Sequence, residues 1–182
     1  MKTSSLKKQL INGLAITVLT TSALGGVAIA ATPSVSASTS AIQISEKTAV
    51  KKFQKTFKNS KVVEVQLEKK MGGYRYEISG RDDQQEHDLT INAKSGKIIN
   101  KHSEQLDDDD QDTALDLSKL ITRKQATKIA EKAAKSGKAT SWDLSYENGT
   151  PVWEIEVSHG HQQHDVKINA DNQKVISNEQ DD

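Results

Sequence analysis

Cysteine is absent from this chain of 182 residues. Its absence excludes a disulfide framework, a thiolate metal site and anchoring through a lipid-modified cysteine. Recognisable catalytic signatures are missing as well, because neither G-x-S-x-G nor H-E-x-x-H occurs in the sequence. We therefore expect a protein that is not an enzyme and whose stability comes from packing alone.

An excess of positive charge is also lacking. The 25 lysine and arginine residues are balanced by 25 aspartate and glutamate residues. Three of the lysines, Lys2, Lys7 and Lys8, lie in an N-terminal segment that we expect to be removed, which leaves 22 basic and 25 acidic residues. A net charge of minus three does not indicate the basic surface that binding to nucleic acid requires.

The N-terminal segment has the layout of a secretory signal peptide, residues 1–37. The three lysines precede an apolar run from Leu10 to Ala30, and small residues follow. Two sites fit the small-x-small rule, so we expect cleavage after Ala30 or after Ala37. The alternative is a retained membrane anchor, because the run is nearly long enough to span a bilayer. After cleavage we expect no stable membrane span and a secreted protein.

The mature sequence repeats itself without a gap at an offset of 77 positions. Residues 44–105 align with residues 121–182, and the two copies share Glu-Ile, His-Asp and Ile-Asn-Ala segments. We divide the chain into a short tail at 38–43, a first repeat at 44–103, an acidic linker at 104–120 and a second repeat at 121–182. The aspartates at 107–110 lack the spacing of a calcium loop, so we expect a solvated linker there.

Each repeat is predicted to begin with a capped amphipathic helix. Ser45 and Thr122 stand at cap positions, and Gln125 completes a capping box in the second copy. The apolar stripe expected to face the core consists of Ala49, Val50, Phe53 and Phe57 in one copy and Ala126, Ile129, Ala130 and Ala133 in the other.

Strands are predicted to follow each helix. The Asn148-Gly149 pair indicates a two-residue hairpin turn that places Leu144 opposite Trp153 and Trp142 opposite Ile155. In the first copy the matching face is Val63, Val65 and Leu67 against Tyr76 and Ile78. A third strand and a short last one, near 97–99 and 174–176, complete each sheet. The predicted fold class is α+β, with two tandem small domains, each an N-terminal helix packed on a three- to four-stranded antiparallel sheet.

The segments YRYEISGRDDQQEHDLTINAKSGKII and PVWEIEVSHGHQQHDVKINADNQKVI resemble the PepSY family. In that family a capped helix precedes a strand of the form y-Val/Ile-Glu-Val, and a later strand ends in Asp/Asn-Ala-x-x-Gly-x-Val/Ile. The resemblance implies small helix-on-sheet domains, found in propeptides of thermolysin-type secreted metallopeptidases, in spore germination proteins and in tandem in secreted bacterial proteins. It implies a role in binding and restraining peptidases, and it brings no catalytic residues.

Three of the five histidines, His159, His161 and His164, lie within six residues and form a candidate metal site. Strand parity predicts that His159 and His164 are direct cross-strand neighbours, with His161 in a loop at 160–163 as a third ligand. Imidazole donors suit Zn(II), Ni(II) or Cu(II). The first copy holds Asp82, Gln84 and His87 at these positions, which predicts an ordinary cross-strand ion pair between Asp82 and His87. The alternative is therefore a solvent-exposed hairpin with incidental histidines and no cofactor.

We interpret the chain as a protein that is secreted or associated with the cell wall and that binds a protein partner, either a secreted peptidase or a component of the cell envelope. The open edges of an antiparallel sheet are the natural docking surface for such a partner. A histidine-based protein that binds metal weakly and a structural spacer associated with the cell wall are the alternatives.

Overall fold

The computed structural model describes residues 41–106 and 113–181. The predicted signal peptide, residues 38–40 of the tail and the aspartates at 107–110 lie outside the described residues. In the part of the chain that is described, no helix has the length and apolar character needed to cross a membrane.

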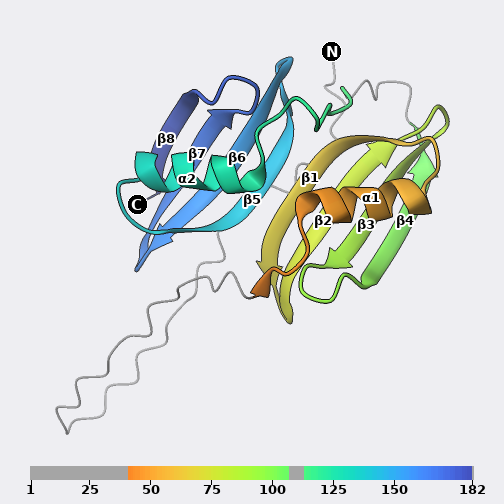
Figure 1. Ribbon diagram of the computed structural model, residues 1–182, viewed down its shortest axis with the longest axis horizontal. Coiled ribbons are helices and arrows are strands. Elements are labelled where there is room, and N and C mark those ends of the chain that lie inside the picture. The colour runs from red at the N-terminus through yellow and green to blue at the C-terminus, as the bar shows by residue number, and fades with distance from the viewer. Residues whose placement is uncertain (1–40, 107–112, 182) are drawn as a thin grey trace, which may run out of the picture.

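Each repeat contains one helix followed by four strands (Figure 1). In the first repeat these are α1 (Glu46–Thr56), β1 (Lys61–Lys70), β2 (Gly73–Arg81), β3 (Gln85–Asn92) and β4 (Ile98–Gln105). In the second they are α2 (Arg123–Ala133), β5 (Lys138–Glu147), β6 (Thr150–His159), β7 (Gln162–Asn169) and β8 (Val175–Asp181). The predicted helix-on-sheet unit is thus present twice, and each of its sheets has four strands.

Both helices begin at the predicted caps. The side chain of Ser45 accepts a hydrogen bond from the amide of Thr48, and Thr122 forms the full capping box with Gln125. Ala49, Val50 and Phe53 of α1 are buried. In α2, Ala126 and Ala130 are buried, whereas Ile129 and Ala133 are partly buried and pack against the core. The capped ends and the apolar stripe together position each helix across one face of the sheet.

The predicted β5–β6 hairpin is confirmed, since Leu144 pairs with Trp153 and Trp142 pairs with Ile155. The first copy differs in one position. A bulge between Val62 and Glu64 shifts the register of β1, so that Val62 rather than Val63 joins the main core cluster. An extra residue in a bulge moves its neighbours to the opposite face, which strand alternation alone does not reveal.

The last strands are longer than predicted. We expected short strands near 97–99 and 174–176, but β4 extends to Gln105 and β8 to Asp181. All residues of β4 are exposed, so its side chains carry no apolar alternation that would mark it. Its backbone ladder to β3 holds it in place. The first repeat therefore runs two residues into the segment that we assigned to the linker.

The two four-stranded sheets are joined into one. The order of the eight strands is β4-β3-β2-β1-β5-β6-β7-β8, and every neighbouring pair is antiparallel. Both helices lie on the same face of this sheet, as Figure 1 shows. Our prediction described two separate small domains and did not include the pairing of β1 with β5. The core is consequently shared by both repeats.

The contact between β1 and β5, which we call the seam, has a pseudo-twofold axis. Its cross-strand pairs are Val65 with Leu144, Gln66 with Asp143, and Leu67 with Trp142. Gln66 and Asp143 occupy equivalent positions in the two repeats, so the axis passes between them. The seam therefore has the isologous arrangement of a homodimer interface, formed within one chain.

Glu46 and Arg123 meet across the same axis, on the helix side of the sheet. They too are equivalent, each being the first residue of its helix, and they form an ion pair with 3.9 Å between Glu46 Oε2 and Arg123 Nε. The Arg123 guanidinium also lies 4.9 Å from the centre of the Trp142 ring, on a strand of the seam. Opposite charges at equivalent positions favour pairing of unlike repeats, because two like repeats would place two equal charges there.

Candidate functional site

The histidine segment forms the hairpin between β6 and β7, with a tighter turn than predicted. Gly160 and His161 alone make the turn, and Gly160 has a φ of 65°. A turn of two residues in place of four moves the register by two. As a result His159 lies opposite Gln162, and His164 lies opposite Val157.

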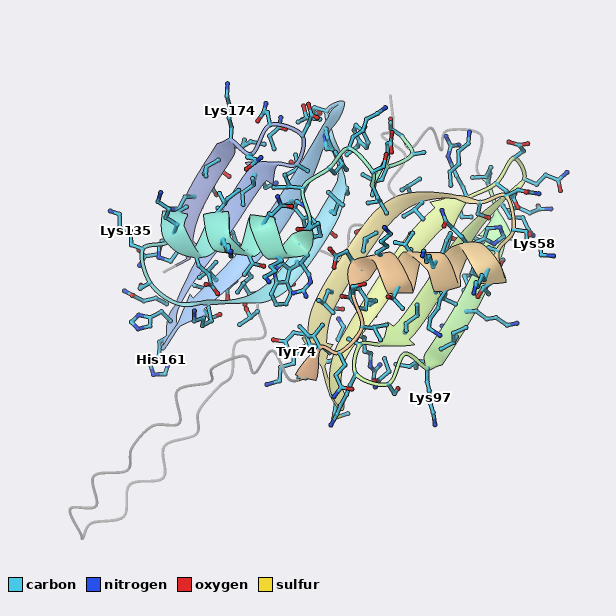
Figure 2. All side chains as sticks on the ribbon, in the orientation of Figure 1. Lys58, Tyr74, Lys97, Lys135, His161 and Lys174 are labelled. Carbon is cyan, nitrogen blue, oxygen red and sulfur yellow. The ribbon has the colours of Figure 1, made fainter. Side chains whose placement is uncertain are left out.

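The predicted direct pairing of His159 with His164 is therefore wrong. The two residues share a face of the sheet but are diagonal neighbours, which are about 7–8 Å apart, or somewhat less between Cβ atoms, whereas the Cβ atoms of direct partners are about 4.5–5.5 Å apart. His161 lies at the outer tip of the hairpin (Figure 2). Among residues 41–106 and 113–181, no group of three or more histidine, aspartate or glutamate side chains is arranged to hold a metal ion. Metal binding by these histidines stays a prediction, which a zinc titration of the protein and of its His159→Ala variant tests.

His164 has a defined structural role in the second repeat. Its Nδ1 lies 3.1 Å from Oδ1 of Asn178 in β8, and the Asn178 amide donates to the carbonyl of Ala133 at 2.9 Å. Ala133 is the last residue of α2. His164 and Asn178 thus connect the sheet to the C-terminal end of the helix.

The equivalent residue in the first repeat, His87, is the buried centre of a polar cluster that also contains the partly exposed Asp82 and the exposed Ser103. Its Nε2 lies 3.1 Å from Oδ2 of Asp82, so the predicted contact is present. The predicted cross-strand pairing is wrong, because His87 lies opposite Gly80 and Asp82 stands in the turn after β2. The Nδ1 of His87 lies 2.7 Å from Oγ of Ser103 in β4. The ring stacks on Phe57, with 4.3 Å between the ring centres and an angle of 13° between the planes. His87 is only 5% exposed.

Sequence reasoning missed Ser103, because β4 was not predicted to extend that far. The signal that would have found it is the cross-strand register, which pairs His87 with Ser103 once β4 is known. Asp82, His87 and Ser103 follow the order of a hydrolase relay. The His87 ring is buried under Phe57, however, which shields it from a substrate. We interpret the cluster as a clamp that fixes the β2–β3 turn to β4 and α1.

Electrostatics around this clamp favour the ionised carboxylate. The pKa of Asp82 is lowered to about 2, first by a hydrogen bond from the amide of Gln84, then by His87 and by the amide of Gln85. The two amides donate to Oδ1 of Asp82 at 2.9 Å each. Hydrogen bonds to a carboxylate stabilise its charged form, so the turn and the ionisation of Asp82 support each other.

The two outer strands of the described sheet each leave one side of the backbone without a neighbouring strand. β4 and β8 form the outer edges (Figure 1). Each edge begins with two exposed branched side chains: Ile98 and Ile99 are 47% and 46% exposed, and Val175 and Ile176 are 44% and 53% exposed. These four residues are equivalent in pairs between the repeats. Each edge thus combines unpaired backbone groups with a small apolar surface.

The direction of the free amides follows from the hydrogen bonds at the end of β4. The amide of Leu106 donates to the carbonyl of Gln84, so even-numbered residues of β4 face β3. In an antiparallel ladder alternate residues face opposite sides. The amides of Lys101 and Ser103 consequently point to the open edge, and Asn178 and Gln180 hold the equivalent positions in β8.

Comparison with known proteins supports the family resemblance. Residues 43–102 and 120–179 each match the model of the PepSY family, described as the peptidase propeptide and YPEB domain. A crystal structure of a putative lipoprotein from Clostridium difficile 630 is similar to this chain, with a TM-score of 0.70 and 23% sequence identity. The similarity covers 77% of this chain and 95% of the other, and at this identity it concerns the fold. A search of curated proteins gives no match.

The family match has a limited functional content. PepSY domains are of the propeptide or inhibitor type, are generally not catalytic, interact with other proteins and are often extracellular. The two matched segments together cover more than half of the chain. On this basis the chain belongs to the PepSY family and contains the family's domain twice, in tandem.

Proposed function

We propose that this protein is a secreted, non-enzymatic regulator that binds, and thereby inhibits, an extracellular peptidase. The family description as a peptidase propeptide supports the choice of partner. The observation that carries the proposal is the pair of open edges β4 and β8, each with free backbone amides and an exposed apolar pair. A component of the cell envelope is the other partner that these edges suit.

The mode of binding follows from the edges themselves. An extended segment of the partner adds as a ninth strand, so that its backbone pairs with β4 or β8. Ile98 and Ile99, or Val175 and Ile176, then supply the side-chain contacts that backbone pairing lacks. The signal peptide at 1–37, cleaved after Ala30 or Ala37, delivers the protein to the extracellular side, where wall association keeps it near secreted peptidases.

An inhibition assay with edge variants tests this function. The purified chain 38–182 is added to a thermolysin-type secreted metallopeptidase, and the rate of peptide hydrolysis is measured. We expect inhibition by the wild-type chain and its loss in a Lys101→Pro, Gln180→Pro double variant, because each proline removes one outward-facing amide from its edge and interrupts pairing with an added strand. The matched control is Lys101→Ala, Gln180→Ala, which keeps both amides and should still inhibit.

The outcome that contradicts the proposal is equally specific. If the proline and alanine variants inhibit to the same extent, the edges do not carry the binding. If the wild-type chain leaves the peptidase unaffected at micromolar concentration, peptidase inhibition is wrong, and a pull-down of envelope proteins with the same variants tests the other partner. If neither the inhibition assay nor the pull-down detects a partner, the remaining hypothesis is a structural spacer associated with the cell wall.

A further inference from the structure

Lysines follow the outer side of each helix and continue just past its end. Residues four apart lie on one side of a helix, and the buried residues of α1, Ala49, Val50 and Phe53, lie on the other. All eight of the lysines are exposed. We call them the lysine rows, and they are Lys47, Lys51, Lys55 and Lys58 in the first repeat and Lys124, Lys128, Lys132 and Lys135 in the second.

The lysine rows are the feature that the two helical segments share most closely. Five of the thirteen positions in 46–58 hold the same residue in 123–135, and four of these five are the row lysines. Core positions have changed instead, since Phe53 is equivalent to Ala130 and both are buried. A surface stays soluble with charges of both signs mixed, so solubility alone does not require lysine at these four positions.

The lysine rows also act against the stability of the helices. Lys47, Lys51 and Lys55 repel one another at a spacing of four residues, and so do their equivalents in α2. Lys47 and Lys124 are the second residues of their helices, where the helix dipole disfavours a cation. None of the eight lysines forms an ion pair with another described residue. An anion bound along the rows would relieve this repulsion.

The two rows lie end to end on one face of the molecule. The helices adjoin at their first residues, where Glu46 meets Arg123, and extend outward from the seam (Figure 1). Lys58 and Lys135 accordingly lie near opposite ends of the molecule (Figure 2). Each helix of 11 residues is about 16 Å long. The eight charges therefore form a long and narrow strip.

The other face of the sheet carries acidic charge. Its carboxylates alternate with the buried residues of the inner strands and include Glu64, Glu68, Glu77, Asp88, Glu154 and Glu156. Lysines on that face are paired, as Lys70 is with Glu68 and Lys167 with Glu154. The balanced charge of the whole chain thus divides into a basic helix face and an acidic sheet face. An anionic ligand is attracted to the helix face.

The strip suits a linear polyanion better than a membrane. Lysines four residues apart are separated by about 6 Å along the helix axis, which a chain with one phosphate per short repeat unit follows. A helix that binds a bilayer needs exposed apolar side chains beside its lysines. The large apolar side chains that the described chain exposes are Met71 and the four at the sheet edges, so neither helix offers one.

We propose that the lysine rows bind a linear polymer of the cell envelope that has one phosphate in each repeat unit, as poly(glycerol phosphate) has. The polymer lies along both helices and crosses the seam, and its phosphates pair with the row lysines. This assignment rests on the proposed function only in placing the protein outside the cell. It goes beyond the inhibition, which uses β4 and β8, and gives the association with the cell wall a surface of its own.

A calorimetric titration with a synthetic poly(glycerol phosphate) oligomer tests the lysine rows in the chain 38–182. We expect the Lys51→Gln, Lys128→Gln variant to bind about fivefold more weakly than the wild type, as the loss of two exposed ion pairs would give. Affinity should also fall as salt rises, because the polymer releases counterions on binding. The matched control is Lys97→Gln, Lys174→Gln, which removes two exposed and equivalent lysines from the rim of the molecule and should bind as the wild type does (Figure 2).

Four results would overturn the assignment. Equal losses in the two double variants would show that net charge alone attracts the polymer. Tighter binding to phosphatidylglycerol vesicles than to the polymer, at equal phosphate concentration, would make a membrane the ligand. A dimer in analytical ultracentrifugation that the Lys51→Gln, Lys128→Gln variant loses would make it a second copy. Binding that appears only after the aspartates at 107–110 are replaced by asparagine would make the acidic linker the occupant.

Further measurements separate this surface from the sheet edges. The Lys51→Gln, Lys128→Gln variant should still inhibit the peptidase, and the Lys101→Pro, Gln180→Pro variant should still bind the polymer. A thermal melt checks that each variant is folded. If the polymer binds as expected but the peptidase is not inhibited, the lysine rows stand and the proposed inhibition is wrong. If inhibition occurs without binding of the polymer, the function stands and the assignment of the rows is wrong.

Discussion

Single residues show how the two repeats reach one fold with different side chains. In the first repeat the Phe53 ring packs directly over Gly80, where an added Cβ would lie 2.7 Å from Phe53 Cζ and 2.4 Å from the carbonyl oxygen of Lys61. The equivalent pair in the second repeat is Ala130 and Val157, both buried. A large helix residue over a glycine is therefore replaced by a small helix residue over a large strand residue, which conserves the volume between helix and sheet.

This exchange predicts that Gly80→Val destabilises the protein. Overpacking against Phe53 and the backbone of β1 should lower the free energy of unfolding by about 1–3 kcal/mol. Phe53→Ala in the same chain copies the second repeat and should recover part of that loss, since it removes the ring contact but not the backbone contact. Urea unfolding of the two single variants and the double variant measures the coupling. Strictly additive losses would show that the two sites do not share a packing constraint.

A second prediction at this scale concerns acid. The folded pKa of Asp82 is about 2, against 3.8 for an unperturbed aspartate. Because the folded pKa is the lower one, the stabilisation is fully present above about pH 4 and is lost as the pH falls through 2. Asp82→Asn should therefore lower the stability at pH 6 and flatten its decline between pH 4 and pH 2, as urea unfolding at each pH measures.

The neighbouring carboxylate supplies a control for this effect. Asp83→Asn removes the same charge one residue away, without touching His87 or the amides of Gln84 and Gln85. Its unfolding curves should retain the wild-type decline between pH 4 and pH 2. If Asp82→Asn and Asp83→Asn behaved alike, the clamp around His87 would not be the source of the acid sensitivity.

At the scale of elements, the helices were predictable and the edge strands were not. A helix is marked by its cap and by an apolar stripe, and Thr122, Gln125 and Ala126 show both signals within five residues. β4 has no buried side chain, so nothing in its composition distinguishes it from a polar loop. Only the ladder to β3 makes it a strand, and a ladder is a property of two segments.

The turn at Gly160 was misjudged for a related reason, because turns of two and of four residues both fit the apolar alternation of the flanking strands.

The cap of α2 gives a prediction at this scale. In Thr122→Ala the amide of Gln125 loses the Thr122 hydroxyl as an acceptor, and Oε1 of Gln125 loses the hydrogen bond that this hydroxyl donates to it. The bond from the Thr122 amide to Gln125 Oε1 does not involve the hydroxyl. We expect the free energy of unfolding to fall by about 0.5–2 kcal/mol. Thr122→Ser keeps the hydroxyl group and should stay near the wild type. Equal losses in both variants, measured by urea unfolding, would indicate that the methyl group rather than the cap is responsible.

At the scale of the whole molecule, the seam turns two repeats into one body. Trp142 of β5 pairs with Leu67, and its ring centre lies 6.0 Å from that of Tyr74 of the first repeat. Glu46 and Arg123 add an ion pair on the axis. Strands β1 and β5 would otherwise be open edges in two separate sheets, so the seam removes two of four possible edges and leaves β4 and β8 as the outer ones.

Reversing the charges on the axis tests this arrangement. Arg123→Glu places two glutamates together and should destabilise the protein by about 1 kcal/mol, because an attractive pair becomes a repulsive one. Adding Glu46→Arg restores opposite charges. The double variant should remain about 0.5–1 kcal/mol less stable than the wild type. The reason is that Val65 holds the position equivalent to Trp142, so the new arginine has no aromatic ring to contact there. A double variant no more stable than Arg123→Glu, in urea unfolding, would exclude the ion pair as a contributor.

The sequence by itself determined the repeated unit, its capped helices, the β5–β6 register and the family. These features depend on local signals: cap residues, apolar periodicity and the Asn148-Gly149 turn, each read within one stretch of chain. Only the tertiary structure decided that the two sheets join at the seam, that Ser103 completes the clamp on His87, and that His159 and His164 do not face each other. Each of these depends on which strands pair and in what register. A shift of two residues in one hairpin preserves every local pattern while it moves a side chain to a different neighbour.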